Sequence, residues 1–402
     1  MSDNEIKKIL IVTNVGFPNG MAATNRLISH AKSFIFNNVK TKVLIMNKTE
    51  ILGNVNNTNN HGIFEGVEYN YIFNKTVISK FIIVRAIEKY LKSIKLFYII
   101  LKSCNSNTAI LYYSAYSLPA LSIRLASLIT RSVFVKEETE HPDIRILEKR
   151  NFIEKYFFRK LHYRLFDGIL VITKQLLSYF KEVMKYSKPV ILIPMIVDID
   201  RFNNMPVKKI EINNIVFTGE IDEQKEGIST LIRAFAQAFK KYNNMTLNIY
   251  GKAKDKDKIK QYEELIDNLG VENNITINSY KKRDEVTKIL LNADILIFPR
   301  PYSLQASFGF STKLGEYLAT GNPVIATDVG EVPNYLKYKE NAFLCKPTEE
   351  SLKKKILEIK ENPKLAIEVG NRGRITAETF FNNKVESKKI IEFCLLLKNN
   401  LH

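Results

Sequence analysis

Short apolar runs alternate with longer amphipathic stretches along most of this chain. Apolar runs of this length predict strands that are buried on both faces of a parallel sheet. In the first half they cover 8–13, 42–46, 109–113, 132–136, 168–173 and 189–194. In the second half they cover 214–218, 246–250, 274–277, 295–299, 323–327 and 342–345. The stretches between them carry apolar residues at helical spacing, as in 228–241, 349–361 and 363–380, so the pattern predicts an α/β fold.

The alternation of strands and helices runs twice, with the polar linker Asn203–Pro206 between the two series. A chain of 402 residues is also too long for one ordinary core. We therefore predict two doubly wound Rossmann-like domains, residues 1–203 and 204–382, and the cleft between them is the default ligand site. A last amphipathic helix in the segment 383–402 is expected to pack back toward the N-terminal domain. Residues 47–75 are rich in Asn and predict at most a short strand.

The stretch 300–331 combines features that favour an anion-binding site. A polar lead-in, Ser307–Lys313, precedes a helix predicted from Leu314 to Ala319, and a short apolar strand follows. Free N–H groups and the positive end of the helix dipole favour an anion at such a helix start. Arg300 and Lys313 add two cations, and Glu316 is placed one turn into the helix. A phosphate with a neighbouring hydroxyl donor, such as ribose, suits this arrangement.

Two polar segments near the N-terminal strands are further candidates. The loop Asn14–Gly20 lies between a strand and a helix, but it lacks the full G-x-G-x-x-G pattern, and a plain strand–helix turn explains it as well. Glu137, Glu138, Glu140 and His141 follow the strand 132–136, at the end where ligands of open α/β sheets bind. The alternative, preferred from these residues alone, is a solvated loop.

The net charge of +18 has three explanations. The first is compositional, because Lys, Asn and Ile are abundant throughout the chain. The second is attraction to an anionic membrane: residues 75–102 hold seven Lys or Arg against Glu88 alone, interleaved with apolar residues. The helix predicted over 151–166 is also basic and amphipathic. The third explanation, nucleic acid, ranks last because no recognised nucleic-acid-binding motif is present.

Composition narrows the class of protein further. With 45% hydrophobic and 25% charged residues, the chain is globular. Cys104, Cys345 and Cys394 have no pairing or metal-binding spacing, which is typical of reduced thiols in a cytosolic protein. From the polar N-terminus we expect no signal peptide, and no apolar run is long enough to span a membrane. We therefore expect a cytoplasmic protein, peripheral at the inner membrane face. Two D-x-D triplets are weak signals of a metal site, and we expect no metal or other cofactor.

Three stretches resemble the GT-B glycosyltransferases of the family-4 type, which are retaining and use nucleotide-sugars. PMIVDIDRF (194–202) is similar to that family's interdomain signature. FTGEIDEQKEGISTLIRAF (217–235) resembles its phosphate loop with the following helix, and FGFSTKLGEYLATGNPVIATDVGEVP (308–333) resembles its donor-binding segment. The N-terminal VTNVGFPNGMAATNR is a weaker match to the family's first strand and Gly loop.

The resemblance implies a GT-B fold, with two Rossmann-like domains facing a central cleft, and a role for each matching residue. Glu316 would hydrogen-bond the donor ribose, Tyr280 would lie near the nucleobase, and His141 would stand beside the transferred sugar. The remaining positions would contact or approach the donor, chiefly its diphosphate: Gly20 from the N-terminal domain, and Gly219, Lys225, Ser311, Thr312 and Lys313. The leaving phosphate would itself help to deprotonate the acceptor hydroxyl.

Two positions depart from the family pattern. The family's first acid of the E-x7-E pair should stand at Phe308, and the Arg that usually follows the phosphate-loop Gly should stand at Glu220. One sugar-binding acid and one phosphate-binding cation are therefore missing from their usual places. Arg300 is the candidate replacement for the cation.

The sequence thus predicts a glycosyltransferase that moves a sugar from a nucleotide-sugar to a hydroxyl of a saccharide or lipid-linked acceptor in cell-surface polysaccharide synthesis. Two alternatives stay open. Phe308 and Glu220 would also suit a catalytically impaired binding or partner subunit. A sugar-nucleotide epimerase on the same fold is less consistent with the donor-binding segment.

Overall fold

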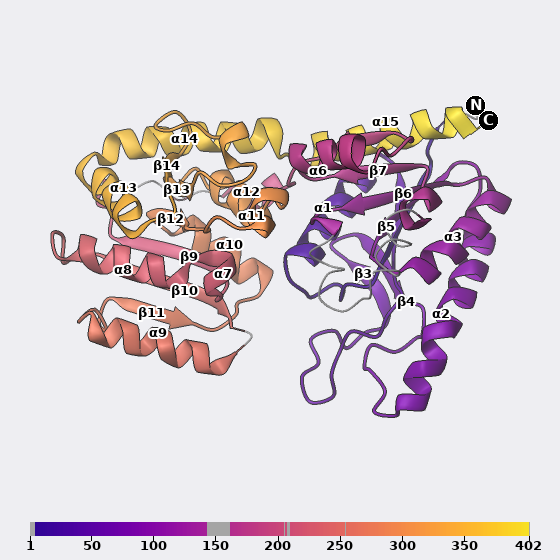
Figure 1. Ribbon diagram of the computed structural model, residues 1–402, viewed down its shortest axis with the longest axis horizontal. Coiled ribbons are helices and arrows are strands. Elements are labelled where there is room, and N and C mark those ends of the chain that lie inside the picture. Colours follow the sequence, from indigo (N-terminus) through magenta and orange to yellow (C-terminus); the bar gives the residue numbers. More distant parts are fainter. Residues whose placement is uncertain (1–4, 143–160, 205, 207–209, 254, 402) are drawn as a thin grey trace. The chain divides into compact units, whose positions relative to one another are not determined.

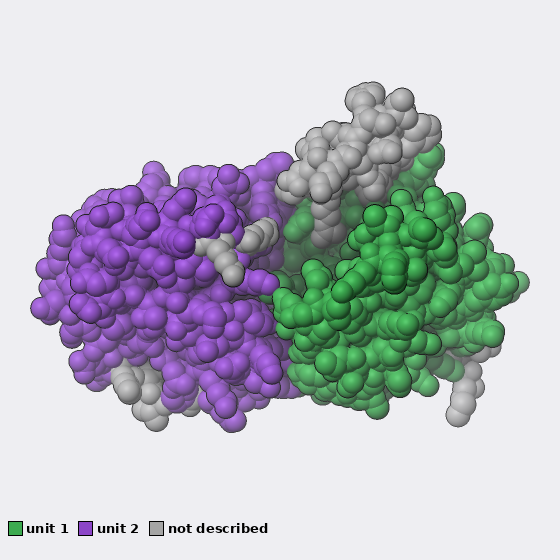
Figure 2. All heavy atoms as spheres, turned by 90° about the horizontal axis from the view of Figure 1, so that it is seen from below, with its two compact units in different colours: residues 1–196, 383–402 green, residues 197–382 purple. Residues whose placement is uncertain are grey.

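The computed structural model describes residues 5–142, 161–204, 206, 210–253 and 255–401. The chain forms two compact units (Figure 2): unit 1 contains residues 1–196 and 383–402, and unit 2 contains residues 197–382. The sequence placed the boundary after residue 203, whereas the structure places it after Ile196. The linker segment belongs to unit 2 because the Val197 N–H donates to the Phe381 carbonyl and Phe202 is fully buried there.

Eight strands form the sheet in the described part of unit 1 (Figure 1). Their spatial order is β3-β4-β2-β1-β5-β6-β7-β8, and every pair is parallel except β3 with β4. The strands are β1 Lys8–Thr13, β2 Lys40–Ile45, β3 His61–Phe64, β4 Val67–Tyr71, β5 Thr108–Tyr113, β6 Val133–Glu138, β7 Gly168–Val171 and β8 Val190–Leu192.

Two of these strands lie in 47–75, where the sequence predicted at most one. In β4, the buried Val67, Tyr69 and Tyr71 alternate with the less buried Glu68 and Asn70. Because of this alternation β4 contains no continuous apolar run, and the strand was therefore not predicted from the sequence.

Helices cover both faces of this sheet (Figure 1). Alternate residues of β1 point to opposite faces, so Ile9 and Ile11 lie in one core and Leu10 and Val12 in the other. The first core is completed by α1 (Ala22–Phe36) and α15 (Asn383–Leu401), and the second by α2 (Ile82–Ser103) and α3 (Ser117–Thr130). A Cβ added at Gly168 in β7 would lie 2.7 Å from the Phe393 ring of α15, so the last helix packs directly on the strand.

Two helix predictions in unit 1 have different outcomes. The helix predicted over 174–185 begins as α6 (Lys174–Ser178) but continues as a π-helical turn, η3 (Tyr179–Val183). The basic helix predicted over 151–166 lies mainly outside the described residues. In the described end of that range, Tyr163–Leu165 form the 3-10 turn η2.

In unit 2, the described residues include a six-stranded sheet that is parallel throughout. Its order is β11-β10-β9-β12-β13-β14, with β9 Asn214–Glu220, β10 Thr246–Lys252, β11 Ile275–Asn278, β12 Ile295–Phe298, β13 Val324–Thr327 and β14 Phe343–Cys345. The helices are α7 Glu223–Glu226, α8 Ile228–Phe239, α9 Lys256–Asn268, α10 Arg283–Leu291, α11 Leu304–Phe308, α12 Thr312–Ala319, α13 Glu349–Glu361 and α14 Pro363–Phe380. The 3-10 turns η4 (Ile199–Phe202) and η5 (Val332–Asn334) complete it. The predicted α/β fold with two doubly wound units is confirmed.

No helix among the described residues has the length and apolar character needed to cross a bilayer. Each sheet reverses its strand order at one point, between β1 and β5 in unit 1 and between β9 and β12 in unit 2. Loops on either side of such a point leave toward opposite faces of the sheet, which opens a crevice at the carboxyl ends of the strands. The candidate site is therefore expected at these ends.

Candidate functional site

The carboxyl ends of β9 and β12 bring together residues that are far apart in the sequence. Gly219 lies at the end of β9, and Arg300 lies two residues beyond β12. These are the two strands at which the order of the sheet reverses. Tyr280 follows β11 at the same edge, with about half of its surface exposed. The structure thus places three predicted donor-site residues along one sheet edge of unit 2.

Helix α12 begins at this edge, two residues earlier than predicted. Its N-cap residue is Ser311 in an extended conformation, and Thr312 and Lys313 form the first turn. No acidic side chain and no side-chain cap occupies that first turn. Buried Tyr317 fixes the helix to β9, because its hydroxyl accepts from the Thr218 N–H at 2.8 Å and donates to the Thr218 carbonyl at 3.1 Å. The helix start therefore presents backbone N–H groups at the carboxyl edge of the sheet.

The polar lead-in to α12 is partly helical rather than a plain loop. Helix α11 covers Leu304–Phe308, and the Ser303 hydroxyl caps it by accepting from the Ala306 N–H at 3.0 Å. Phe308, which stands where the family pattern has an acid, is the last residue of this helix and is half-buried.

A buried ionic cluster of Lys313, Glu226 and Arg300 lies next to the first turn of α12. The Lys313 ammonium is 2.7 Å from one carboxylate oxygen of Glu226, and the Arg300 guanidinium is 3.5 Å from the other. The Glu226 side chain is only 1% exposed, whereas those of Lys313 and Arg300 are 14% and 8% exposed. Two cations thus share one acid, and the cluster carries a net positive charge.

Gly219 makes room for this arrangement. A Cβ at position 219 would lie 2.2 Å from the Lys313 ammonium, which also sits 4.6 Å from the centre of the Phe217 ring. Burial lowers the pKa of Lys313 to about 8, although attraction to Glu226 offsets part of this effect. Apolar surroundings and the neighbouring Arg300 therefore disfavour the charged amine, and a bound anion would favour it.

Lys225 has an acidic neighbour of its own. Its ammonium is 2.9 Å from the carboxylate of Glu220, the residue that stands where the family pattern has an Arg. The Asp222 carboxylate caps α7 by accepting from the Lys225 N–H at 2.9 Å. The predicted phosphate-binding Lys is thus positioned by a capped turn, and its charge is balanced by Glu220.

Glu316 is bound by a residue that the sequence interpretation did not single out. Arg201, in η4, donates to one carboxylate oxygen of Glu316 at 2.5 Å. A second guanidinium nitrogen of Arg201 donates to the Thr287 hydroxyl at 2.6 Å and to the Arg283 carbonyl at 3.1 Å. The Glu316 side chain is 12% exposed and that of Arg201 is 9% exposed. The signal was present in the resemblance, since Arg201 belongs to the matched stretch 194–202.

Gly20 and His141, the two remaining candidates, belong to unit 1. A Cβ at Gly20 would lie 2.0 Å from the Thr24 hydroxyl, which donates to the Gly16 carbonyl at 2.8 Å, so the glycine allows the loop to close tightly on α1. His141 is buried, with its ring centre 4.4 Å from that of Tyr179.

The solvated-loop interpretation of the Glu137–His141 segment is wrong for its first two acids. Glu137 and Glu138 are the last residues of β6, and each is 2% exposed. Glu137 accepts from Arg26 at 2.6 Å and lies 3.1 Å from His30. Burial opposes ionisation, but these two bases hold the pKa of Glu137 well below its usual range. The described residues contain no group of three or more His, Cys, Asp or Glu side chains arranged to hold a metal ion.

Comparisons with known proteins concern the family and the fold. Residues 200–376 match the protein family described as Glycosyl transferases group 1. A protein of Methanocaldococcus jannaschii, named as an uncharacterized glycosyltransferase, is 29% identical over 133 residues, which are 33% of this chain and 32% of that protein. The chain thus matches about a third of the length of that relative.

Solved structures match over nearly the whole chain. The sucrose-phosphate synthase from Thermosynechococcus elongatus has a TM-score of 0.74 at 15% identity, covering 98% of this chain and 100% of that one. HepE of Anabaena, solved in complex with UDP, has a TM-score of 0.67 at 16% identity, covering 96% of this chain and 99% of that one. At these identities the likeness concerns the fold. The chain therefore has the GT-B fold, and its residues 200–376 are similar to the family described as Glycosyl transferases group 1.

Proposed function

We propose that this protein is a glycosyltransferase that moves a sugar from a nucleotide-sugar to a hydroxyl of a saccharide or lipid-linked acceptor, in the synthesis of cell-surface polysaccharide. The observation that carries the proposal is the start of α12, where backbone N–H groups lie beside the Lys313–Glu226–Arg300 cluster and one turn from Glu316. The same-fold HepE was solved with UDP, which supports a nucleoside diphosphate as the common part of the donor.

The proposed chemistry needs stabilisation of negative charge more than acid–base groups. The bond between the sugar and the diphosphate breaks, a bond forms to the acceptor oxygen, and the hydroxyl proton passes to the leaving phosphate. The N–H groups of α12 and the cations Lys313, Arg300 and Lys225 stabilise the leaving diphosphate as its charge develops. We assign the donor ribose to Glu316, whose carboxylate is oriented by Arg201. Retention of the anomeric configuration is part of the proposal and rests on the family resemblance.

The experiment that tests the proposal is a panel of nucleotide-sugars and their diphosphates, read out by thermal stabilisation and by sugar transfer. A ligand that binds only the folded protein raises its unfolding temperature, by an amount that grows with concentration relative to Kd. We expect a shift for one nucleotide and its sugar conjugate. An unchanged unfolding temperature across the whole panel at millimolar concentration would contradict the proposal.

A second candidate function, a glycosyltransferase-like binding or partner subunit, is favoured by one contact. Glu220 balances the charge of Lys225, so that this Lys offers a diphosphate less attraction than an unpaired one would. Stabilisation by nucleotide without any transfer or hydrolysis of the sugar would favour this alternative.

We also propose that unit 1 associates with the anionic inner face of the membrane. Exposed apolar side chains form one stripe on α2 (Ile83, Ile87, Tyr90 and Ile94) and another on α3 (Leu118, Leu121, Leu125 and Leu128). Each of these side chains is at least 43% exposed, and basic residues of 75–102 flank the first stripe. Apolar stripes with basic flanks are typical of interfacial helices. Equal flotation with neutral and anionic liposomes would contradict this assignment.

A further inference from the structure

A small cationic pocket in unit 1 lies outside the donor-site residues described above. Its volume is about 160 Å³, and its lining contains four cations (Lys48, Arg85, Lys89 and Lys92), one acid (Glu88), and Asn47, Phe73 and Ile78. The lining therefore has a net charge of +3, from four positive charges and one negative charge. A cavity of this size is below the roughly 300–1,000 Å³ typical of whole small-molecule ligands, so it suits one small charged group.

The pocket lies where strands of unit 1 end. Asn47 and Lys48 come shortly after β2, and Phe73 comes shortly after β4, so these residues lie at the carboxyl edge of the sheet. Arg85, Glu88, Lys89 and Lys92 come from one side of α2, at helical spacing. The loop containing Gly20 and the segment containing His141 follow β1 and β6 at the same edge of the same sheet. This is the edge at which open α/β sheets bind ligands.

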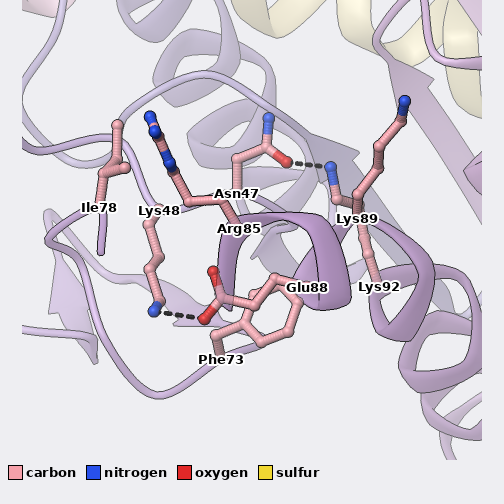
Figure 3. A pocket seen from close by; sticks show the side chains of 8 residues that line it. All are labelled: Asn47, Lys48, Phe73, Ile78, Arg85, Glu88, Lys89 and Lys92. Atoms are coloured by element: carbon pink, nitrogen blue, oxygen red, sulfur yellow. Dashed lines mark hydrogen bonds and ion pairs between the residues drawn. The ribbon is translucent and has the colours of Figure 1, made fainter. Parts of the chain in front are cut away.

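The positive charge of the pocket is only partly balanced inside it. Figure 3 shows two contacts among the lining residues: Lys48 pairs with Glu88 at 2.5 Å, and the Lys92 ammonium donates to the Asn47 side-chain carbonyl. The second contact joins a cation to a neutral amide and leaves its charge in place. Within the described part of the chain, the side chains of Arg85 and Lys89 have no hydrogen-bond or ion-pair partner.

The titration of Lys92 agrees with an excess of positive charge. Burial lowers the pKa of Lys92, and the neighbouring Lys89 lowers it further, while Glu88 acts in the opposite direction. An anion in the pocket would reverse this effect by favouring the charged ammonium. Arg85 adds a planar fork of donors, and this geometry suits the paired oxygens of a phosphate group.

We infer that this pocket binds a phosphate group of the acceptor. The inference deepens the proposed function and rests on it, because the carboxyl edge of the unit 1 sheet is taken as the acceptor side. Two sources share this chemistry, a lipid-linked phosphate presented at a membrane and a soluble sugar phosphate.

The test compares two double variants that each remove two positive charges. R85Q/K89Q alters two residues that line the pocket. K80Q/K102Q alters two residues of the basic segment 75–102 that do not line the pocket. Binding is measured to phosphatidylcholine vesicles that carry polyprenyl phosphate, to vesicles that carry the same fraction of a carboxylate amphiphile, and to inorganic pyrophosphate in solution. A saturating nucleoside diphosphate is present throughout, so that unit 2 is already occupied.

We expect R85Q/K89Q to weaken phosphate binding about tenfold or more and K80Q/K102Q to weaken it about threefold or less. Loss confined to the polyprenyl phosphate vesicles assigns the lipid source, and loss of pyrophosphate binding alone assigns the soluble source. Equal losses in the two double variants, both with polyprenyl phosphate vesicles and with pyrophosphate, would overturn the pocket. The lipid source also requires tighter binding of the phosphate vesicles than of the carboxylate vesicles.

Thermal stabilisation by the nucleoside diphosphate is measured in every variant and separates the two proposals. An intact nucleotide response with no effect of R85Q/K89Q on phosphate binding rejects the pocket alone. Absence of a nucleotide response in the unaltered protein rejects the proposed function.

Discussion

Each unit contains a buried carboxylate shared by two basic side chains, and the two clusters differ in what surrounds them. In unit 1, Glu137 binds Arg26 and His30, while the remaining guanidinium nitrogens of Arg26 donate to the carbonyls of Pro194 and Ile193 at 2.9 and 3.3 Å. Burial lowers the pKa of His30 despite the attraction of Glu137, so this base is largely neutral near pH 7. The acid and the one full cation therefore balance.

In unit 2, Glu226 faces two cations, and its cluster lies against a helix start with no acidic residue in the first turn. Positive charge is left over beside the backbone N–H groups of that helix start, although the Lys313 ammonium itself is buried. The same chemical components therefore give a structural cross-link in one unit and a candidate anion site in the other. The difference lies in the remaining charge and in the helix start beside it.

The largest expected effect is on the unit 1 cluster. Arg26→Met leaves the Glu137 carboxylate buried without its nearest cation, and we expect a loss of about 3–5 kcal/mol in the free energy of unfolding. The measurement is urea unfolding at pH 7. Lys32→Met on the same helix is the matched control, because the Lys32 side chain is 28% exposed in its pair with Glu65 and an exposed pair contributes about 1 kcal/mol or less.

Measuring the nucleotide affinity of the Arg26→Met protein tests whether the unit 1 cluster is purely structural. We expect it to match that of the unaltered protein at temperatures where the variant is folded. A loss of nucleotide binding as large as the loss of stability would show that the unit 1 cluster is not merely structural.

An effect of intermediate size is expected at Glu316 and Arg201. Glu316→Gln and Arg201→Met should each weaken nucleoside diphosphate binding by roughly tenfold to a hundredfold, since hydrogen bonds to charged groups contribute about 1.5–3 kcal/mol. Because Arg201 acts through Glu316, the double variant should lose little more than either single one. The measurement is titration calorimetry, with Arg372→Met, in an exposed pair with Glu368, as the control.

Additive losses at these two positions would contradict a positioning role for Arg201. In that case Arg201 would contact the ligand itself or support another part of the site.

The smallest effect concerns pH. Lys313 is charged below its pKa of about 8 and neutral above it, so nucleoside diphosphate affinity should fall severalfold between pH 7 and pH 9. The ligand's own phosphates are already ionised in this range, because their second pKa is near 6. Lys313→Met should flatten the profile, and Lys225→Met should preserve its shape.

Stability should change in the opposite direction over the same window. The unfolded chain keeps the Lys313 proton up to about pH 10.5, so between pH 8 and that value it binds more protons than the folded protein does. This group therefore makes the folded state more stable as pH rises from 8. Parallel changes in affinity and stability would indicate that another residue is responsible.

Most of the fold could be predicted because its central strands are buried on both faces and read as continuous apolar runs. The prediction failed where that signal is missing: β3 is the edge strand of its sheet, and its neighbour β4 alternates apolar and polar residues. Helix α11 was not predicted because five residues are too few to show the apolar spacing of a helix. Its start is marked only by the Ser303 cap.

The candidate site could be predicted only where its residues are close together in the sequence. The segment around Lys313 and Glu316 was identified because its helix start, cations and acid are close in the sequence. Arg201 is 115 positions from Glu316, and the pairing of Glu226 with two cations depends on how α7, α12 and β12 meet in space. The burial of Glu137 and Glu138 could not be predicted either, because a segment with three acids in four residues looks solvated until β6 is seen to extend through Glu138.

The return of the last helix to unit 1 has a consequence for how the protein is made. Ile390, Phe393, Cys394 and Leu397 of α15 complete a core whose other buried members come from the first 196 residues. A ribosome therefore releases the whole of unit 2, which is continuous in sequence, before unit 1 can close. We expect unit 2 to acquire its structure first, although it is encoded second, and a chain that stops at residue 382 to leave unit 1 open.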